Sequence, residues 1–167
     1  MTSTLSPTTQ HLRLGAFEGS WRGEEEVFAS TWTAAGEAQA EVESEVLFGG
    51  FFVEQSYRQT REGKLSFSAR NMLAFDATDG AYKLYQFDSV GFVPQAPATG
   101  QWEGNSLLLV KTSPRGRQRT LYTFENEDRY RMNVQFAPAG SDDWQDVVSG
   151  VYRRVASFSP NQTQEGL

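Results

Sequence analysis

Alternation of apolar and polar residues with a period of two runs through most of the chain, and it constrains the fold more than any other feature. In residues 130–136 the apolar positions are Tyr130, Met132, Val134 and Phe136. Such alternation is typical of half-buried antiparallel strands, whose successive side chains point to opposite faces. In Gln39–Val46 it places Glu41, Glu43 and Glu45 on one face. We expect that face to lie in water, because adjacent buried carboxylates would repel one another.

The alternating segments are separated by glycine, proline and aspartate, the residues that form tight turns. The expected strands are residues 21–32, 39–46, 51–59, 65–75, 81–88, 100–103, 107–112, 118–125, 130–136 and 146–155. Only Pro7–Phe17 has a helical pattern, and a parallel sheet would need regular helices between its strands. Closing a long sheet on itself removes both edges. The sequence therefore predicts an all-β, roughly ten-stranded antiparallel β-barrel with a short N-terminal helix.

The length of 167 residues corresponds to one domain. We expect a single barrel domain over residues 11–156, with flexible ends at residues 1–10 and 157–167. The N-terminal ten residues lack the basic and apolar runs of a secretory signal. No window approaches the roughly 20 apolar residues that span a bilayer, so a cytoplasmic protein without a membrane span is predicted.

Composition excludes many classes of function. The absence of cysteine excludes disulfides, thiol nucleophiles and zinc fingers, and the single histidine, His11, excludes a histidine-rich metal site. A net charge of −6 argues against nucleic-acid binding. There is no serine–histidine–aspartate arrangement and no phosphate-binding loop, and Glu24, Glu25 and Glu26 are too close in sequence to act as an opposed acid/base pair. We therefore predict no metal, no cofactor and no catalytic residue.

Two features leave alternatives open. Residues 1–62 are rich in glutamate and residues 111–154 are rich in arginine. Both can be solvated sheet faces, or some of the arginines can point inward and hold an anionic ligand. His11 can gate a ligand or respond to pH from a helix above the barrel mouth, or it can be a packing residue of that helix.

The Gly19-Ser20-Trp21 segment resembles the opening signature of the lipocalins and the wider calycin group. In those proteins the tryptophan plugs one end of a barrel beneath an N-terminal helix, and an arginine of the last strand packs across its ring. The resemblance implies that Arg154, or alternatively Arg153, partners Trp21.

The order of motifs over roughly His11–Val155 is similar to the bacterial family known as domain of unknown function 1579. The matching stretches are His11–Trp21, Leu47–Phe52 with Gly49 and Gly50, Phe75-Asp76, Asp79-Gly80, Tyr82, Asp88–Gly91, Gly100–Gly104 and Tyr152–Arg154. Phe51 departs from the pattern, since many relatives carry arginine there. The resemblance implies a calycin-like barrel with structural roles for Gly19, Trp21, Gly49, Gly50 and Tyr152. The family has no agreed activity, and the late histidine of related haem-binding barrels is absent.

Several polar residues share a phase with apolar ones, and we expect them to line a cavity. In the strand at 65–75 the apolar phase is Leu65, Phe67, Ala69, Leu73 and Phe75, with Asn71 as its polar member. The candidate ligand-binding residues are Gln55, Tyr57, Asn71, Gln86, Asp88, Tyr122 and Arg154.

The function predicted from these residues is a carrier or sensor of a mainly apolar or amphipathic small molecule. An anionic group of that molecule would meet Arg154 or Arg119. The alternatives are a packed barrel that acts as a homo-oligomeric interaction module, such as a homodimer, and an enzyme that uses Asp88, Tyr57 or Tyr122.

Overall fold

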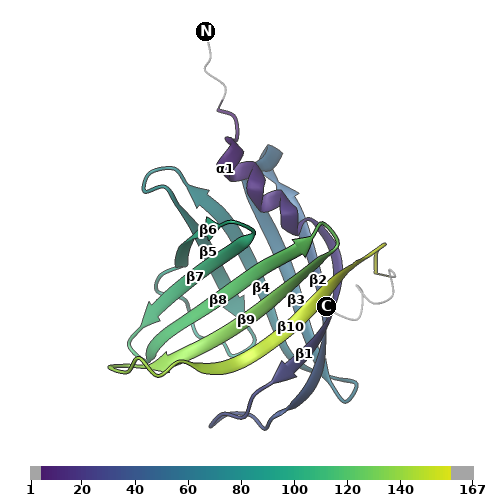
Figure 1. The fold of residues 1–167 in the computed structure, drawn as a ribbon, viewed down its shortest axis with the longest axis vertical. Coiled ribbons are helices and arrows are strands. Elements are labelled where there is room, and N and C mark those ends of the chain that lie inside the picture. Colours follow the sequence, from purple (N-terminus) through teal and green to yellow (C-terminus); the bar gives the residue numbers. More distant parts are fainter. Residues whose placement is uncertain (1–4, 159–167) are drawn as a thin grey trace.

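The computed structural model describes residues 5–158 as a closed barrel of ten antiparallel strands (Figure 1). The strands are β1 (Gly19–Val27), β2 (Gly36–Leu47), β3 (Phe52–Arg61), β4 (Lys64–Asp76), β5 (Ala81–Asp88), β6 (Ala98–Glu103), β7 (Ser106–Ser113), β8 (Gly116–Asn126), β9 (Arg129–Pro138) and β10 (Gln145–Val155). Each strand pairs with its neighbours in sequence, and β1 closes the barrel against β10. The predicted all-β barrel with a short N-terminal helix is confirmed.

The helical segment before the barrel consists of α1 (Thr9–Leu12) and a 3₁₀ turn, η1 (Arg13–Phe17), and a second turn, η2 (Phe48–Gly50), follows β2. Residues 1–4 and 159–167, which hold much of the two ends expected to be flexible, lie outside the described residues. In the described part of the chain, no helix has the length and apolar character that crossing a bilayer requires.

Two expectations about the strands were wrong. The first strand ends at Val27 rather than Trp32, and the Trp32 side chain is 93% exposed in the loop before β2. Leu65 is exposed rather than part of the apolar phase of β4. The reason is a register shift in the β3–β4 pairing between Gln59 and Thr60, because an irregularity of this kind changes the face on which the following side chains lie.

One end of the barrel is closed by the helical segment, which lies across it (Figure 1). Leu14 and Phe17 are buried there, and the Phe17 ring packs against Tyr122 and Phe124 with centroids 5.0 Å apart in each pair. The indole N–H of Trp21 donates to the Phe17 carbonyl at 2.8 Å, which ties the helix to β1. An aromatic cluster therefore fills this end, which we call the closed end.

Arg154 completes the closed end. Its guanidinium lies 4.3 Å from the centroid of the Trp21 ring, so the expected pairing of Trp21 with an arginine of the last strand is confirmed. Gly19 has a φ of 118°, and a Cβ there would collide with the Arg154 guanidinium. A glycine is therefore needed where the chain enters β1.

The opposite end carries loops but no helix (Figure 1), and we call it the open end. The barrel wall is incomplete beside it. Only Tyr82–Leu84 of β5 pair with β6, whereas Ala69–Asp76 of β4 all pair with β5. Residues 85–88 therefore have a strand partner on one side only, and the loop of residues 89–97 follows them.

Candidate binding site in the barrel interior

A buried carboxylate lies on the inner face of β1, toward the open end. Inward-facing Trp21, Gly23, Glu25 and Val27 alternate along this strand with exposed residues, and Glu25 is only 4% exposed. Its Oε2 atom accepts hydrogen bonds from the Tyr57 hydroxyl at 2.5 Å and from the Tyr152 hydroxyl. Its Oε1 atom accepts one from the Gln59 amide at 3.0 Å. We call Glu25, Tyr57, Gln59 and Tyr152 the carboxylate cluster.

Small residues make this cluster possible. Tyr57 and Gln59 belong to β3, so they must reach over β2 to meet Glu25, and the β2 residues in the way are Ala38 and Ala40. On the other side, Glu25 lies opposite Gly150 of β10. A Cβ at Gly150 would lie 2.6 Å from the Tyr152 hydroxyl and 3.0 Å from the Glu25 side chain. Glycine and alanine therefore leave the space that the polar groups occupy.

Gly23 has a similar role beneath Tyr152. A Cβ at Gly23 would collide with the Tyr152 ring, although Gly23 itself has no left-handed backbone. The Tyr152 ring also stacks on Tyr130, with centroids 4.9 Å apart. Tyr152 was expected to be structural, and the structure adds that its hydroxyl is a partner of Glu25.

The electrostatics of the cluster follow from burial. Desolvation, and then the nearby Glu25 charge, raise the pKa of Tyr57 and of Tyr152 far above the ordinary value. Both phenols therefore stay protonated and donate to the carboxylate. Within residues 5–158, Glu25 forms no ion pair, and no group of three or more potential metal ligands is found.

A second polar row crosses three strands of the inner face. The amide of Gln55 donates to Ser44 at 3.2 Å, and the amide of Asn71 donates to the Gln55 carbonyl oxygen at 2.9 Å. The row ends at the Oδ1 atom of Asn71, which is buried without a partner among the described residues. A buried hydrogen-bond acceptor without a donor is unusual, because buried polar groups nearly always have a partner.

The predicted ligand-binding residues fall into three groups. Gln55, Tyr57 and Asn71 point inward and are buried, and Gln86 and Asp88 lie on the inner side of β5, half-buried, with the Gln86 amide 3.1 Å from the Asp88 carboxylate. These five line the inner surface of β3, β4 and β5. Whether they bind a ligand stays a prediction.

Tyr122 and Arg154 belong to the closed end instead. Tyr122 packs against Phe17, and burial raises the pKa of its phenol above the ordinary range. Arg154 donates to the Asp128 carboxylate at 3.1 Å and to the carbonyls of Glu18 and Glu127. The guanidinium nitrogens of Arg154 thus form hydrogen bonds within the protein.

The remaining candidates have structural partners. The Nδ1 atom of His11 accepts a hydrogen bond from the Thr8 backbone at 3.0 Å, and the His11 ring packs edge-on against Phe51 and Phe75. Arg119 lies on the outer face, where its guanidinium is 4.0 Å from the centroid of the Trp144 ring. These contacts favour the packing role of His11 and a solvated role for the arginine-rich strands.

Sequence reasoning missed Glu25 and Gln59. Glu25 stands between Glu24 and Glu26, so it looked like part of a solvated charge run. The signal was nevertheless present, because Trp21, Gly23, Glu25 and Val27 form one phase and Trp21 was expected to point inward.

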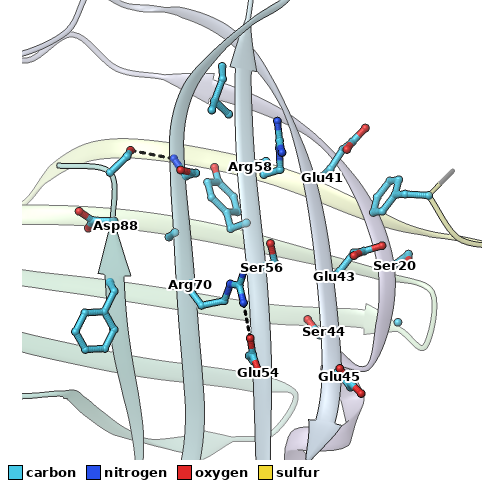
Figure 2. Close-up of a pocket in the computed structure, with 18 residues that line it drawn as sticks. Ser20, Glu41, Glu43, Ser44, Glu45, Glu54, Ser56, Arg58, Arg70 and Asp88 are labelled. Atoms are coloured by element: carbon cyan, nitrogen blue, oxygen red, sulfur yellow. Dashed lines mark hydrogen bonds and ion pairs between the residues drawn. The ribbon is translucent and has the colours of Figure 1, made fainter. Parts of the chain in front are cut away.

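A groove of about 960 Å³ lies elsewhere, across the outer face of β2, β3, β4 and β5. Figure 2 shows Glu41, Glu43 and Glu45 following one another along β2, as expected for a wetted face. On the neighbouring strands Arg70 forms an ion pair with Glu54 at 2.7 Å. The groove is polar, with charges of both signs, and most of the residues that line it are partly exposed.

Comparisons with solved structures show the same fold in other proteins. The protein Rv2717c from M. tuberculosis shares 19% identity, with a TM-score of 0.66 over 89% of this chain and 99% of its own. The S-type phycobiliprotein lyase CPES from Guillardia theta shares 11% identity, with a TM-score of 0.65 over 90% of this chain and 95% of its own. At such identities the likeness concerns the fold alone. No curated protein matches the sequence significantly.

The comparison with protein families agrees with the order of motifs in the sequence. Residues 6–154, which include the helical segment and nearly the whole barrel, match the family described as protein of unknown function (DUF1579). The chain therefore belongs to the DUF1579 family.

Proposed function

We propose that the protein is a carrier or sensor that binds a small, mainly apolar molecule in the half of the barrel next to the open end. The observation that carries the proposal is the contrast along the interior. Aromatic rings fill the closed end, whereas many inward-facing residues near the open end, including Phe67, Gln86 and Asp88, remain partly exposed. Solvent-accessible inner walls with a few polar groups are typical of small-molecule sites.

The lining supports an apolar body with a polar end. Phe67, Met132 and Phe136 supply half-exposed apolar surface, and Gln118 and Lys111 supply polar groups on β8 and β7. The structural likeness to a phycobiliprotein lyase fits a barrel that holds a small molecule. Arg119 lies on the outer wall and Arg154 is engaged at the closed end, so neither supplies an anion site inside.

The proposal is tested by native and denaturing mass spectrometry on freshly purified protein, with an absorption scan of the same sample. A discrete extra mass that disappears on denaturation is expected. For protein that purifies without a ligand, titration with the neutral apolar dye Nile red is expected to give saturable fluorescence. A ligand-free mass together with no saturable dye binding would contradict the proposal.

A filling substitution locates the site. Thr120 is buried on the inner face of β8, one inward position below Tyr122 toward the open end. Thr120→Phe is expected to weaken Nile red binding at least tenfold, because the ring takes the space of the dye. Thr123→Phe is the matched control, since Thr123 lies on the outer face of the same strand. Equal binding by both variants would place the dye outside the barrel.

One observation favours the second candidate, a barrel that pairs with another copy of itself. Large apolar side chains are exposed around the incomplete wall, among them Phe87 at 58% and Phe92 at 60%. Exposed apolar clusters often mark interfaces. Sedimentation velocity over a hundredfold concentration range tests it, and Phe87→Ser is expected to weaken any dimer that forms there.

A further inference from the structure

The Glu25 carboxylate forms no ion pair within residues 5–158, and Arg61, two residues after Gln59 on β3, donates to Thr33 instead. Glu25 receives hydrogen bonds from three neutral donors, two phenols and one amide. Lys111, on the inner side of β7, lies four strands away from β1 in the barrel order, and it forms no ion pair within residues 5–158. A buried carboxylate normally has a cationic partner, because neutral hydrogen bonds offset only part of its desolvation.

The second acceptor lies next to the cluster. In the β3–β4 register Tyr57 is opposite Ala69, and Gln55 is opposite Asn71, so Asn71 is one inward position from the pair that contains Tyr57. Asn71 is 5% exposed, and its Oδ1 atom has no donor among the described residues. The neighbouring amides donate to other groups: Gln55 to Ser44, Gln59 to Glu25, and Gln86, which lies opposite Asn71, to Asp88.

This side of the interior therefore presents a buried carboxylate and an amide oxygen that has no donor among the described residues. We infer that the ligand carries a protonated amine or a similar cationic N–H group, which Glu25 binds and to which Asn71 Oδ1 accepts a further hydrogen bond. The inference rests on the proposed function, since it names the head group of the molecule held in the barrel. It opposes the expectation of an anionic head group.

The alanines around the cluster are compatible with an incoming group. Ala38, Ala40 and Ala69 share the inner face with Glu25, and they carry no polar atoms that could compete for it. The apolar body of the ligand would extend toward the half-exposed Phe67, which packs against the Tyr57 ring with centroids 6.0 Å apart.

The test compares three probes with one chain length, namely decylamine, decanol and decanoate. Their binding to the wild-type protein is measured by calorimetry at pH 7 in 0.5 M NaCl, which screens the overall negative charge of the surface. Decylamine, present as the ammonium ion, is expected to bind at least tenfold more tightly than the other two. The ¹³C resonance of the Glu25 carboxylate is expected to shift on addition of decylamine.

Two variants assign the preference. Glu25→Gln removes the buried charge with little change of shape and is expected to abolish the preference for decylamine. Glu26→Gln removes one charge from the adjacent, exposed outer position and is expected to keep it. If Glu25→Gln does not fold, the wild-type comparison of head groups and the Glu25 resonance still decide the matter.

The outcomes separate the two proposals. Binding of all three probes with equal affinity, or an unchanged preference in Glu25→Gln, would overturn the cationic head group and leave the apolar site standing. No binding of any probe or of Nile red by the wild-type protein would overturn the binding function, and the inference with it.

Discussion

The two ends of the barrel differ in the side chains that occupy the wide interior. At the closed end the helical segment inserts Leu14 and Phe17, and aromatic rings pack on one another, with the Arg154 guanidinium over Trp21. Toward the open end the interior is lined by small residues, amides and one buried carboxylate. The closed end is therefore stabilised by apolar burial, whereas the arrangement of the open half depends on specific hydrogen bonds.

The difference teaches where function can reside in such a barrel. An end filled with rings has little room to change, since interiors are close-packed and tolerate neither voids nor extra atoms. A polar cluster beside an unpartnered acceptor still has a hydrogen-bonding group available for a ligand. Stability and binding should therefore respond to substitutions at opposite ends.

The largest expected effect is the loss of unfolding free energy at alkaline pH, to which tyrosines at both ends contribute. Tyr122 and Tyr130 in the closed end and Tyr57 and Tyr152 in the carboxylate cluster have raised pKa values, chiefly because of desolvation. Their protonated forms are favoured in the folded state, so the stability is fully present below pH 10 and is lost as the pH rises above it. Each tyrosine contributes a slope of about 1.4 kcal/mol per pH unit.

Together the four tyrosines give a slope of roughly 5 kcal/mol per pH unit above about pH 10. Urea unfolding between pH 8 and pH 12, with tyrosinate absorbance recorded in parallel, measures it. Ionisation of more than the exposed tyrosines before unfolding would show that the interior is open to solvent at both ends.

The next largest effect is expected from Phe17→Ala at the closed end. The Phe17 side chain is fully buried among four aromatic rings, so its removal should cost about 3–5 kcal/mol of unfolding free energy. Chemical denaturation measures this loss. The control is Phe87→Ala, which removes a ring that is 58% exposed and should change stability by about 0.5 kcal/mol or less. Comparable losses in both variants would refute the described packing.

A smaller effect is expected from Tyr57→Phe in the carboxylate cluster. The substitution removes one donor from a buried carboxylate, and hydrogen bonds to charged groups contribute about 1.5–3 kcal/mol. Tyr85→Phe, at an exposed tyrosine of β5, is the control. Tyr57→Phe should also reduce the slope of unfolding free energy against pH above pH 10 by the contribution of one tyrosine. An unchanged slope would show that Tyr57 titrates normally.

The smallest effect is expected from Arg154→Gln. Loss of the guanidinium over Trp21 should cost about 1–2 kcal/mol, because the cation–π contact disappears but the buried indole remains hydrogen-bonded to the Phe17 carbonyl. Thermal unfolding measures the loss. Binding of Nile red should be unchanged, and weaker binding would assign Arg154 to the ligand site after all.

Much of the fold could be predicted because it follows from local patterns in the amino-acid sequence. The period of two and the turn residues define ten strands, and β5 was placed at Ala81–Asp88 as observed. Where local signals were ambiguous the predictions failed, as at Leu65, where an irregularity in the strand pairing changes the phase. Nothing in a single strand reveals such a shift.

The candidate site was only partly predictable for a different reason. Gln55, Tyr57 and Asn71 could be found because each is a polar member of an apolar phase, and that property belongs to one strand. The carboxylate cluster joins β1, β3 and β10, and Glu25 and Tyr152 are far apart in sequence. Whether a glutamate within Glu24–Glu26 meets a phenol depends on which strands become neighbours.

The sequence by itself determined the alternation and the turns, because these follow from local periodicity, and its resemblance to the calycin group implied the tryptophan plug and the pairing of Trp21 with an arginine of the last strand. Only the tertiary structure decided that Glu25 is buried with its partners, because closure of the barrel brings β10 beside β1 and sets Gly150 opposite Glu25. Hydrogen bonds act over about 3 Å, so they depend on the register between strands, which no single strand encodes.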